Sequence, residues 1–411
     1  MLSSQRKWVV VGLLSLGMVI AYIDRANLSV VLALKEFQQT FHPSDTERGL
    51  LNSAFFWSYA LLQIPAGWIV DRYGVKFPYA IGFLFWTIFS AVTGMVQSTS
   101  QLVALRFLLG CGESIVGPAS LRWIRFNCKE QERGLAVGIY LAGAKVGPAI
   151  GVPVTAMLVT AFGWRVMFLI AGGVGFLWLI AWLLLVKNDD RQLETTANAA
   201  VSAPSVPFAR LMVSPVMWGI LLGTFCYSYF LFFCVTWLPA YFVEYRHLSL
   251  TSMGLYTMFS FGGMAVVATG AGWAADQMIR RGRDAVKVRK GFIICGLVVA
   301  STELIGGLTD SRSVALFFAI FSLAGLGLAT ANLWALSQTM IPGAAIGRIS
   351  GVQNCASNLS GIVAPILSGW LKQITGSYTA PMQAIWIFLV VGIFSYAVLV
   401  RPRYLPPAIS P

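Results

Sequence analysis

The sequence predicts an all-α polytopic membrane protein with twelve transmembrane helices, arranged as two pseudo-symmetric bundles of six. Three observations predict this fold: an apolar composition, twelve apolar segments of membrane-spanning length, and an internal repeat. Of the 411 residues, 57% are hydrophobic and only 11% are charged, and the mean hydropathy is +0.74. A soluble domain carries about 25% charged residues, so lipid must cover much of the surface of this chain.

Each of the twelve apolar segments is long enough to cross the hydrocarbon core, which takes about 20 residues. The expected spans are residues 8–33, 49–70, 77–97, 101–123, 133–158, 164–186, 215–243, 251–274, 290–308, 313–338, 346–371 and 381–400. The longest polar interruption, rich in Ala, Ser, Thr and Pro, predicts a flexible cytoplasmic linker at 187–210. This linker would divide an N-terminal bundle, 1–186, from a C-terminal bundle, 211–411.

The distribution of basic residues predicts the orientation, because Lys and Arg concentrate in the cytoplasmic loops of membrane proteins. With both termini and the even-numbered loops inside the cell, 20 of the 29 Lys and Arg residues lie on the cytoplasmic side, 6 lie outside and 3 lie within spans. The net charge of +13 is therefore concentrated in short loops and does not indicate a nucleic-acid partner. We expect a monomeric protein in a bacterial inner membrane, surrounded by lipid.

The internal repeat relates the two halves of the chain. Gly67-Trp-Ile-Val-Asp71 follows the second span, and Gly272-Trp-Ala-Ala-Asp276 follows the eighth, each just before a basic loop. Two similar six-span halves are typical of secondary transporters, in which one half rocks against the other around a binding site near the membrane midplane.

Five charged residues lie inside predicted spans: Asp24, Arg25, Arg106, Glu113 and Lys145. A charged side chain at the centre of a membrane costs about 2.5–3.5 kcal/mol on insertion scales, so such residues usually line a water-filled path or bind a charged ligand. Because three of the five are basic, they predict a cavity that holds an anion.

In the fourth span, Arg106 and Glu113 are seven residues apart, which places them about 20° apart on one helix face. A guanidinium matches a carboxylate in a two-point contact, so Arg106 is the candidate clamp for a substrate carboxylate. Glu113 is the candidate carrier of a proton. The alternative is an Arg–Glu lock between helices that never touches substrate. Gly110, Gly112 and Gly117 would let neighbouring helices approach closely.

Asp24 and Arg25 are adjacent in the first span and point about 100° apart, so they do not pair well with each other. Each needs a partner on another helix or in the cavity. Tyr22 and Tyr59 are candidates for hydrogen bonds to substrate hydroxyls, with ordinary helix packing as the alternative.

The loop after the second span resembles a known family signature. Gly67-x-x-x-Asp71-Arg72-x-Gly74-x-Lys76 is similar to the loop 2–3 motif of the major facilitator superfamily. Three further runs resemble its anion:cation symporter branch, which includes proton-coupled sugar-acid transporters, sialin and vesicular glutamate carriers. These runs are Ile23–Ser29, Arg106–Glu113 and Thr236–Pro239.

The resemblance implies roles for individual residues. It implies that the Arg106–Glu113 pair contacts substrate and couples protons. It also implies that Asp24 is a second protonation site and that Arg25 acts in substrate attraction or gating. From the superfamily's pattern of charge contacts on the cytoplasmic face, Asp71 and Arg72 are expected to control the conformational switch.

Lys145 departs from the family pattern, because relatives that carry sugar acids usually have a small or uncharged polar residue near this position in the fifth span. Three interpretations stay open. Lys145 neutralises Glu113 or Asp24, which would weaken proton coupling, or it adds a positive charge for substrate, which would favour a dianion such as a sugar diacid. The third is that its side chain snorkels towards an end of the span.

The second half offers neutral polar groups within its spans. Trp334, Asn354 and Asn358, together with Gln353, suit the hydroxyls of a polyol chain; interhelical amide hydrogen bonds are the alternative. Glu303 is expected to be peripheral, near the outer end of the ninth span.

These patterns predict a secondary active transporter that takes up an organic anion with protons by alternating access. The expected substrate is a sugar acid such as galactonate, glucarate or a hexuronate. An anion exchanger, a uniporter or an exporter of the same superfamily is the alternative. The sequence has no phosphate-binding loop, nucleophile elbow or metalloprotease motif. We therefore expect no enzyme activity, no metal and no cofactor, with H⁺ as the coupling ion.

Overall fold

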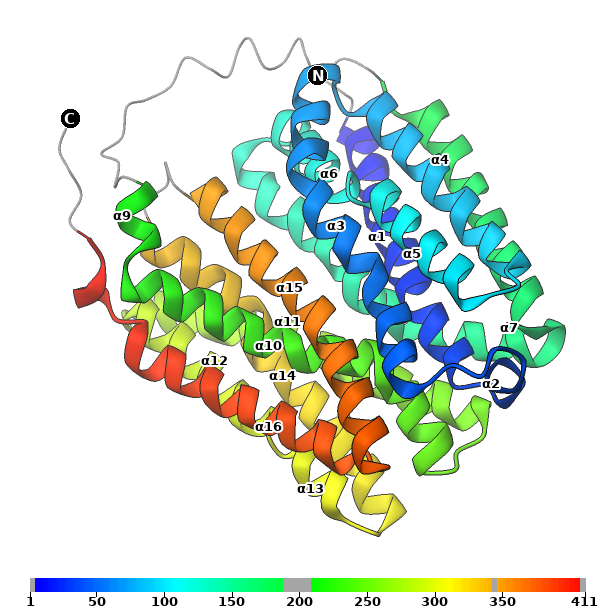
Figure 1. The fold of residues 1–411 in the computed structure, drawn as a ribbon. Coiled ribbons are helices and arrows are strands. Elements are labelled where there is room, and N and C mark those ends of the chain that lie inside the picture. Colours follow the sequence, from blue (N-terminus) through cyan, green and yellow to red (C-terminus); the bar gives the residue numbers. More distant parts are fainter. Residues whose placement is uncertain (1–3, 188–207, 342–345, 407–411) are drawn as a thin grey trace. The chain divides into compact units, whose positions relative to one another are not determined.

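Figure 1 shows the computed structural model, which describes residues 4–187, 208–341 and 346–406. Within these ranges the chain forms helices and no strands. Residues 188–207 of the predicted linker lie outside the described residues. The contacts divide the chain into two compact units: unit 1 contains Met1–Ala200 and Phe242–Met258, and unit 2 contains Val201–Tyr241 and Phe259–Pro411.

Unit 1 is built from long helices joined by short connections. These are α1 (Ser4–Leu32), α2 (Lys35–Phe41), α3 (Asp45–Tyr73), α4 (Lys76–Val92) with the 3₁₀ turn η1 (Thr93–Met95), α5 (Thr99–Glu113), α6 (Val116–Asn127) and α7 (Glu130–Leu185). Within the unit, α1 packs along α7, and α4 packs against both α5 and α7.

Unit 2 repeats this arrangement of long helices. They are α9 (Phe208–Met212), α10 (Pro215–Ala240), α11 (Leu250–Arg280), α12 (Ala285–Ala300), α13 (Glu303–Leu308), α14 (Arg312–Met340), α15 (Ile346–Thr375) and α16 (Thr379–Phe394), with the short helices η2 (Tyr241–Tyr245), η4 (Ser395–Leu399) and η5 (Pro402–Tyr404). η2 and α11 each cross a boundary between the units, because Phe242–Met258 is assigned to unit 1.

All twelve predicted spans fall on helices, which confirms the all-α membrane-protein fold. Ten helices of the described residues are long and apolar enough to cross a membrane. One of the ten, α7, contains both the fifth and sixth predicted spans and changes direction at Gly163, whose φ of 79° is readily adopted only by glycine. The eleventh predicted span is α15, which carries several polar residues and is not among the ten.

Local sequence signals explain where several helices begin and end. Ser44 caps α3 by accepting a hydrogen bond from the Glu47 backbone N–H, and the Glu47 side chain accepts one from the Ser44 backbone N–H in return. Ser98 caps α5 by accepting a hydrogen bond from the Gln101 backbone N–H. Gly74, part of the loop motif, ends α3 with a φ of 82°, so the motif needs glycine at this position.

Glycines set the close approach of the helices around the charged residues of α1 and α5. A side chain at Gly110 would collide with the Phe55 carbonyl of α3, and one at Gly112 would lie 2.7 Å from the Gly82 carbonyl of α4. Gly117 has open space around it, so only two of the three glycines predicted to allow close packing do so.

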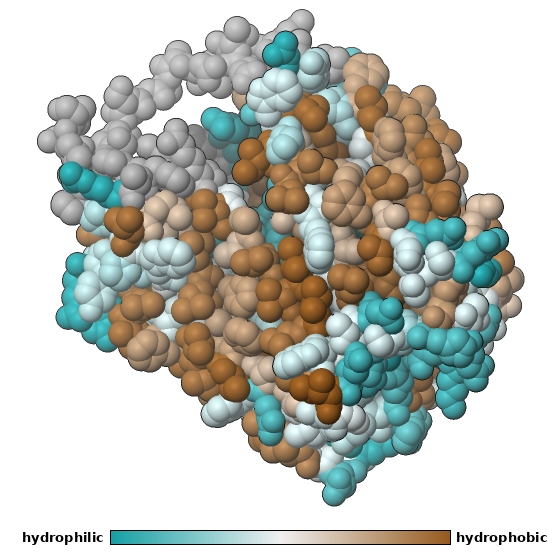
Figure 2. All heavy atoms as spheres, in the orientation of Figure 1, coloured by the Kyte–Doolittle hydropathy of each residue, from teal (hydrophilic) through white to brown (hydrophobic). Residues whose placement is uncertain are grey.

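The surface is largely apolar on the helix sides. Figure 2 shows hydrophobic side chains exposed over the helices, with hydrophilic ones gathered mainly towards helix ends and loops. Ile64 in unit 1 and Val266 in unit 2 are among the most exposed large hydrophobic residues. This distribution matches a protein whose helix sides face lipid.

Candidate functional site

Unit 1 buries four charged side chains from two helices. Asp24 and Arg25 of α1 are 3% and 9% exposed, and Arg106 and Glu113 of α5 are 2% and 0% exposed. Since burying unpaired charge is costly, the partners of each group indicate which charges are satisfied by the protein itself.

Asp24 is held by neutral donors from α4. Its carboxylate accepts hydrogen bonds from Trp86 Nε1 at 2.7 Å and from Ser90 Oγ at 3.0 Å. Asn27 of the same helix contributes a longer contact of 3.4 Å. Because no cation makes a salt bridge with Asp24 among the described residues, this carboxyl can gain or lose a proton without breaking an ion pair.

Arg25 pairs with Glu113 and joins α1 to α5. Arg25 Nε donates to Glu113 Oε1 at 2.7 Å, and Arg25 Nη2 forms an ion pair with the same oxygen. Three aromatic rings surround the guanidinium, since its Cζ lies 4.5 Å from the ring centre of Tyr22, 4.7 Å from Phe55 and 4.6 Å from Tyr59. Cation–π attraction holds the guanidinium in place. Glu113 Oε2 has no hydrogen-bond partner.

Arg106 is a buried cation that leaves much of its hydrogen-bonding capacity unused. Its Nη1 donates to the backbone carbonyl of Asp24 at 3.0 Å. Its Nε and Nη2, which together form one edge of the guanidinium, have no hydrogen-bond partner. That edge presents two parallel N–H groups with the spacing of the two oxygens of a carboxylate. The helix lock considered for Arg106 and Glu113 is formed instead by Arg25 and Glu113.

Lys145 lies half-buried on α7. Gly143 and Gly147, on either side of it, bring α7 against α1, where a side chain at Gly147 would lie 2.6 Å from Tyr22 Cβ. Lys145 makes no ion pair with another described residue: Glu113 pairs with Arg25, and Asp24 is bonded by Trp86 and Ser90.

The candidate residues of unit 2 lie on α14 and α15. Trp334 is half-buried, and Asn358 Nδ2 donates to the Asn354 backbone carbonyl at 2.9 Å within α15. Gln353 has a different role, since its amide donates to Thr224 Oγ1 at 3.0 Å and accepts from Ser337 Oγ at 2.8 Å. Gln353 therefore ties α15 to α10 and α14.

The two copies of the Gly-Trp-x-x-Asp repeat each end in an Asp–Arg pair within their own unit. Asp71 of α3 accepts from Arg122 Nη1 at 2.6 Å, and Asp276 of α11 accepts from Arg289 Nη2 at 3.0 Å. Arg72 lies near the rings of Trp68 and Tyr73, with its Cζ at 5.4 Å and 5.7 Å from their centres.

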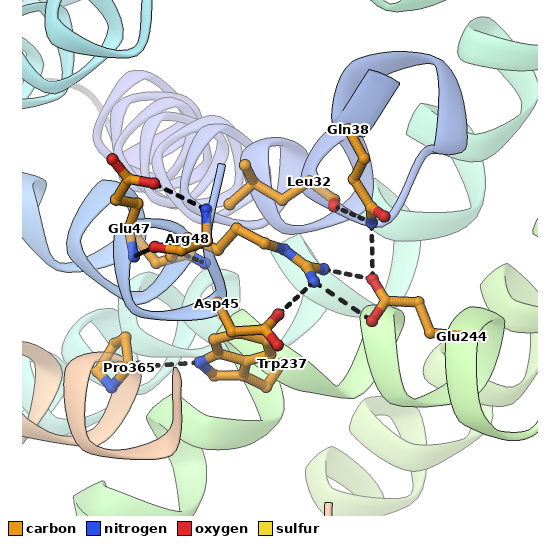
Figure 3. Close-up of polar contacts among 10 residues, drawn as sticks. Leu32, Gln38, Asp45, Glu47, Arg48, Trp237, Glu244 and Pro365 are labelled. Carbon is orange, nitrogen blue, oxygen red and sulfur yellow. Dashed lines mark hydrogen bonds and ion pairs between the residues drawn. The ribbon is translucent and has the colours of Figure 1, made fainter. Parts of the chain in front are cut away.

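Sequence reasoning missed a polar cluster in unit 1 that Figure 3 shows. Arg48, only 3% exposed, pairs with Asp45 at 2.8 Å and with Glu244 at 2.5 Å. Gln38 Nε2 also donates to Glu244 Oε1 at 2.8 Å. The sequence places Arg48 on the outer side of the membrane, and no periodic pattern there indicates its partners.

Two further side chains of unit 2, Glu303 and Trp237, make hydrogen bonds within the unit. Glu303, expected to be peripheral, is buried and accepts a hydrogen bond from Ser322 Oγ at 2.5 Å. Trp237, in the motif of the seventh span, donates from Nε1 to the Pro365 carbonyl at 3.0 Å within unit 2, a bond that Figure 3 also draws. In the described part of the chain no three His, Cys, Asp or Glu residues gather as metal ligands.

Residues 14–365 match the model of the Major Facilitator Superfamily. The chain is 29% identical to the D-galactonate transporter of Escherichia coli, covering 96% of each chain. It is 31% identical to the probable sulfoacetate transporter SauU of Cupriavidus necator, covering 93% of this chain and 91% of the relative.

Among solved structures, the fold is similar to a bacterial homologue of the human lysosomal transporter Spinster, crystallised in an inward-facing and occupied conformation. The TM-score is 0.82, the sequence identity is 18%, and 98% of each chain is covered. At this identity the likeness concerns the fold alone.

Proposed function

Because the chain belongs to the major facilitator superfamily of membrane transporters, we propose that it is a proton-coupled symporter that carries an organic anion of the sugar-acid class into the cell. One observation carries the proposal: the Nε–Nη2 edge of Arg106 is buried and has no hydrogen-bond partner. A buried guanidinium edge without a partner is costly unless a ligand completes its hydrogen bonds. The group that matches this edge is a carboxylate.

Glu113 and Asp24 are the groups that would carry protons. Glu113 Oε2 has no partner, so a proton can bind there while Oε1 stays bonded to Arg25. Protonation would remove the negative charge that neutralises Arg25, and the uncompensated positive charge of the guanidinium would then favour a substrate anion. Asp24 is bonded only to neutral donors, so its charge can change without disrupting a salt bridge.

Lys145 would hold a second anionic group or a polar end of the substrate. Because Lys145 makes no ion pair with another described residue, this role is favoured over neutralisation of Glu113 or Asp24. Arg25, Tyr22 and Tyr59 would contribute to the same site, since the two phenol rings hold the Arg25 guanidinium.

Unit 2 would supply neutral recognition of hydroxyl groups through Trp334, Asn354 and Asn358. The proposed motion is alternating access, with an N-terminal bundle at 1–186 and a C-terminal bundle at 211–411 moving as bodies. Asp71 and Arg72 would bias that motion from the loop between α3 and α4.

The relatives support the substrate class, because one is named a transporter of D-galactonate and another a probable transporter of sulfoacetate. Both substrates are organic anions. The named relatives fit the anion:cation symporter branch.

The test is uptake of a panel of sugar acids and dicarboxylates into proteoliposomes, with and without an inward proton gradient. The proposal predicts gradient-driven accumulation of at least one acid above its external concentration. Liposomes that contain Arg106→Ala protein serve as the matched control. Exchange of the acid without any response to the proton gradient would overturn the symport mechanism and favour an exchanger or uniporter.

A further inference from the structure

Several buried hydroxyl groups of unit 1 have no role in the site described above. Three of them are Tyr79 on α4, Ser120 on α6 and Tyr140 on α7, and all three side chains are buried. None of their oxygen atoms completes a hydrogen bond of good geometry. Buried hydroxyls nearly always have partners, so what these three bind needs an explanation.

The three hydroxyls form one cluster. Ser120 interacts with both phenol groups, and Tyr79 and Tyr140 interact with each other electrostatically. Tyr79 also interacts electrostatically with Glu113. Buried polar groups that approach one another without bonding directly are typically bridged by internal water, which makes about three hydrogen bonds per molecule.

The cluster lies between Glu113 and one end of unit 1. Ser120 follows Glu113 by seven residues, or about 10 Å along a helix, in the direction of the α6–α7 connection. Tyr79 lies in the first turn of α4, near the α3–α4 connection, and Tyr140 lies ten residues after the start of α7. These connections carry many of the basic residues that predict the cytoplasmic side.

We propose that Tyr79, Ser120 and Tyr140, bridged by internal water, form a proton relay between the Glu113 carboxyl and the end of unit 1 that bears the α3–α4 and α6–α7 connections. This inference rests on the proposed proton coupling and names its path. A proton that leaves Glu113 binds to the oxygen of the nearest water or hydroxyl. That group releases its own proton to the next, so each is unchanged after one proton has passed.

The proposed path leads towards a partly exposed end of α7. Glu132, at the start of α7, forms an ion pair with Lys7 of α1 at 2.5 Å and remains partly exposed. It precedes Tyr140 by eight residues, or about 12 Å along the helix. Because Lys7 lowers the pKa of Glu132 and keeps this carboxylate charged, the proton that leaves the relay passes to solvent water at this end.

The test compares Tyr79→Phe, Ser120→Ala and Tyr140→Phe with wild type in proteoliposomes, using D-galactonate and D-glucarate as probes. Each change removes one hydroxyl, and phenylalanine keeps the ring that packs at position 79 against Trp178 and Trp182. Tyr396→Phe is the matched control, because Tyr396 is a buried phenol of unit 2 whose oxygen also has no partner.

A pH-sensitive dye inside the liposomes reports proton entry with substrate, and counterflow reports substrate exchange. The relay predicts that each unit 1 variant lowers substrate-dependent proton entry by fivefold or more and keeps exchange within twofold of wild type. Tyr396→Phe should keep both. Two outcomes overturn the relay and leave the proposed function intact. In the first, all three variants take up protons at the wild-type rate; in the second, proton entry and exchange fall equally. If wild type itself carries no proton with either acid, the proposed coupling is wrong and the relay falls with it.

Discussion

Arg106 and Glu113 of unit 1 differ from Gln353 of unit 2 in how completely the protein satisfies their hydrogen bonds. In unit 1, Arg106 keeps an edge with two unused donors and Glu113 keeps an unused oxygen. In unit 2, the buried amide of Gln353 both donates and accepts, to Thr224 and from Ser337. A polar group with all its partners inside the protein fixes structure, whereas a buried charge with unused capacity is available for a ligand or a proton. This difference supports our proposal that ion binding takes place in unit 1.

The largest effect is expected for a change at Arg106. Arg106→Lys keeps the positive charge but replaces the planar fork with an ammonium group that cannot make two parallel bonds to a carboxylate. We expect substrate affinity to fall by about 100-fold, within the range for loss of one partner of a buried charged pair. Calorimetric titration of D-galactonate into the purified protein measures the change.

Arg165→Lys is the matched control for Arg106→Lys. Arg165 also lies in unit 1, but its Nη1 donates to the backbone carbonyls of Gly94 and Val96 at 3.1 Å and 2.9 Å. Its replacement should leave affinity within a few-fold of wild type. If Arg106→Lys binds the acid as wild type does, the carboxylate is held elsewhere.

The next largest effect is expected for proton coupling at Glu113. Glu113→Gln keeps the size of the side chain and removes the titrating group, so it should abolish accumulation driven by a proton gradient while substrate counterflow continues. Glu303→Gln makes the same change at a buried carboxyl of unit 2 and should keep accumulation. Accumulation by Glu113→Gln equal to wild type would exclude Glu113 as the coupling site.

The sequence predicted the fold and which residues to examine, but it did not predict how they pair. Hydropathy and length locate eleven of the twelve spans, because membrane helices must be long and apolar; the polar residues of α15 keep it outside that criterion. A charge within a span stands out for the same reason, which is why Asp24, Arg25, Arg106 and Glu113 were found. Helical geometry indicates which residues of one helix share a face, and it carries no information about the neighbouring helix.

Three pairings show this limit. The donors to Asp24 are Trp86 and Ser90, an aromatic and a small residue that look like ordinary packing positions in α4. Glu113 pairs with Arg25, 88 residues away, rather than with Arg106 on its own helix. The contact between Arg48 and Glu244 joins residues 196 positions apart. Such pairs depend on the three-dimensional packing of helices.

A third change tests the structural role assigned to unit 2. Gln353→Ala removes the amide that bonds Thr224 and Ser337 and leaves both hydroxyls with one partner fewer. The free energy of unfolding should fall by about 1–3 kcal/mol, the cost of leaving buried polar groups unsatisfied. A thermal unfolding scan in detergent measures the change. The folded variant should still transport anions in preference to cations. A reversal of this charge selectivity would show that unit 2 also determines the charge of the substrate.

A smaller and more selective effect is expected at Lys145. If its ammonium holds a second anionic group, Lys145→Gln should weaken transport of D-glucarate, a diacid, by about tenfold, which corresponds to about 1.4 kcal/mol. Transport of D-galactonate, a monoacid, should change less than threefold. Competition between the two acids in one uptake assay gives the ratio directly. An equal loss for both acids would contradict a second anion-binding position.

The smallest effect on stability is expected at the repeated Asp–Arg pairs. The side chain of Asp71 is 69% exposed and that of Asp276 is 54% exposed, and exposed ion pairs contribute about 0–1 kcal/mol. Asp71→Asn and Asp276→Asn should therefore each shift thermal unfolding by only a few degrees. If Asp71 biases the conformational switch, Asp71→Asn should nevertheless slow uptake several-fold while substrate affinity stays unchanged. If uptake instead falls in both variants in proportion to their loss of thermal stability, the pairs serve to hold each unit together. A role in the conformational switch predicts a lower uptake rate without a matching loss of stability.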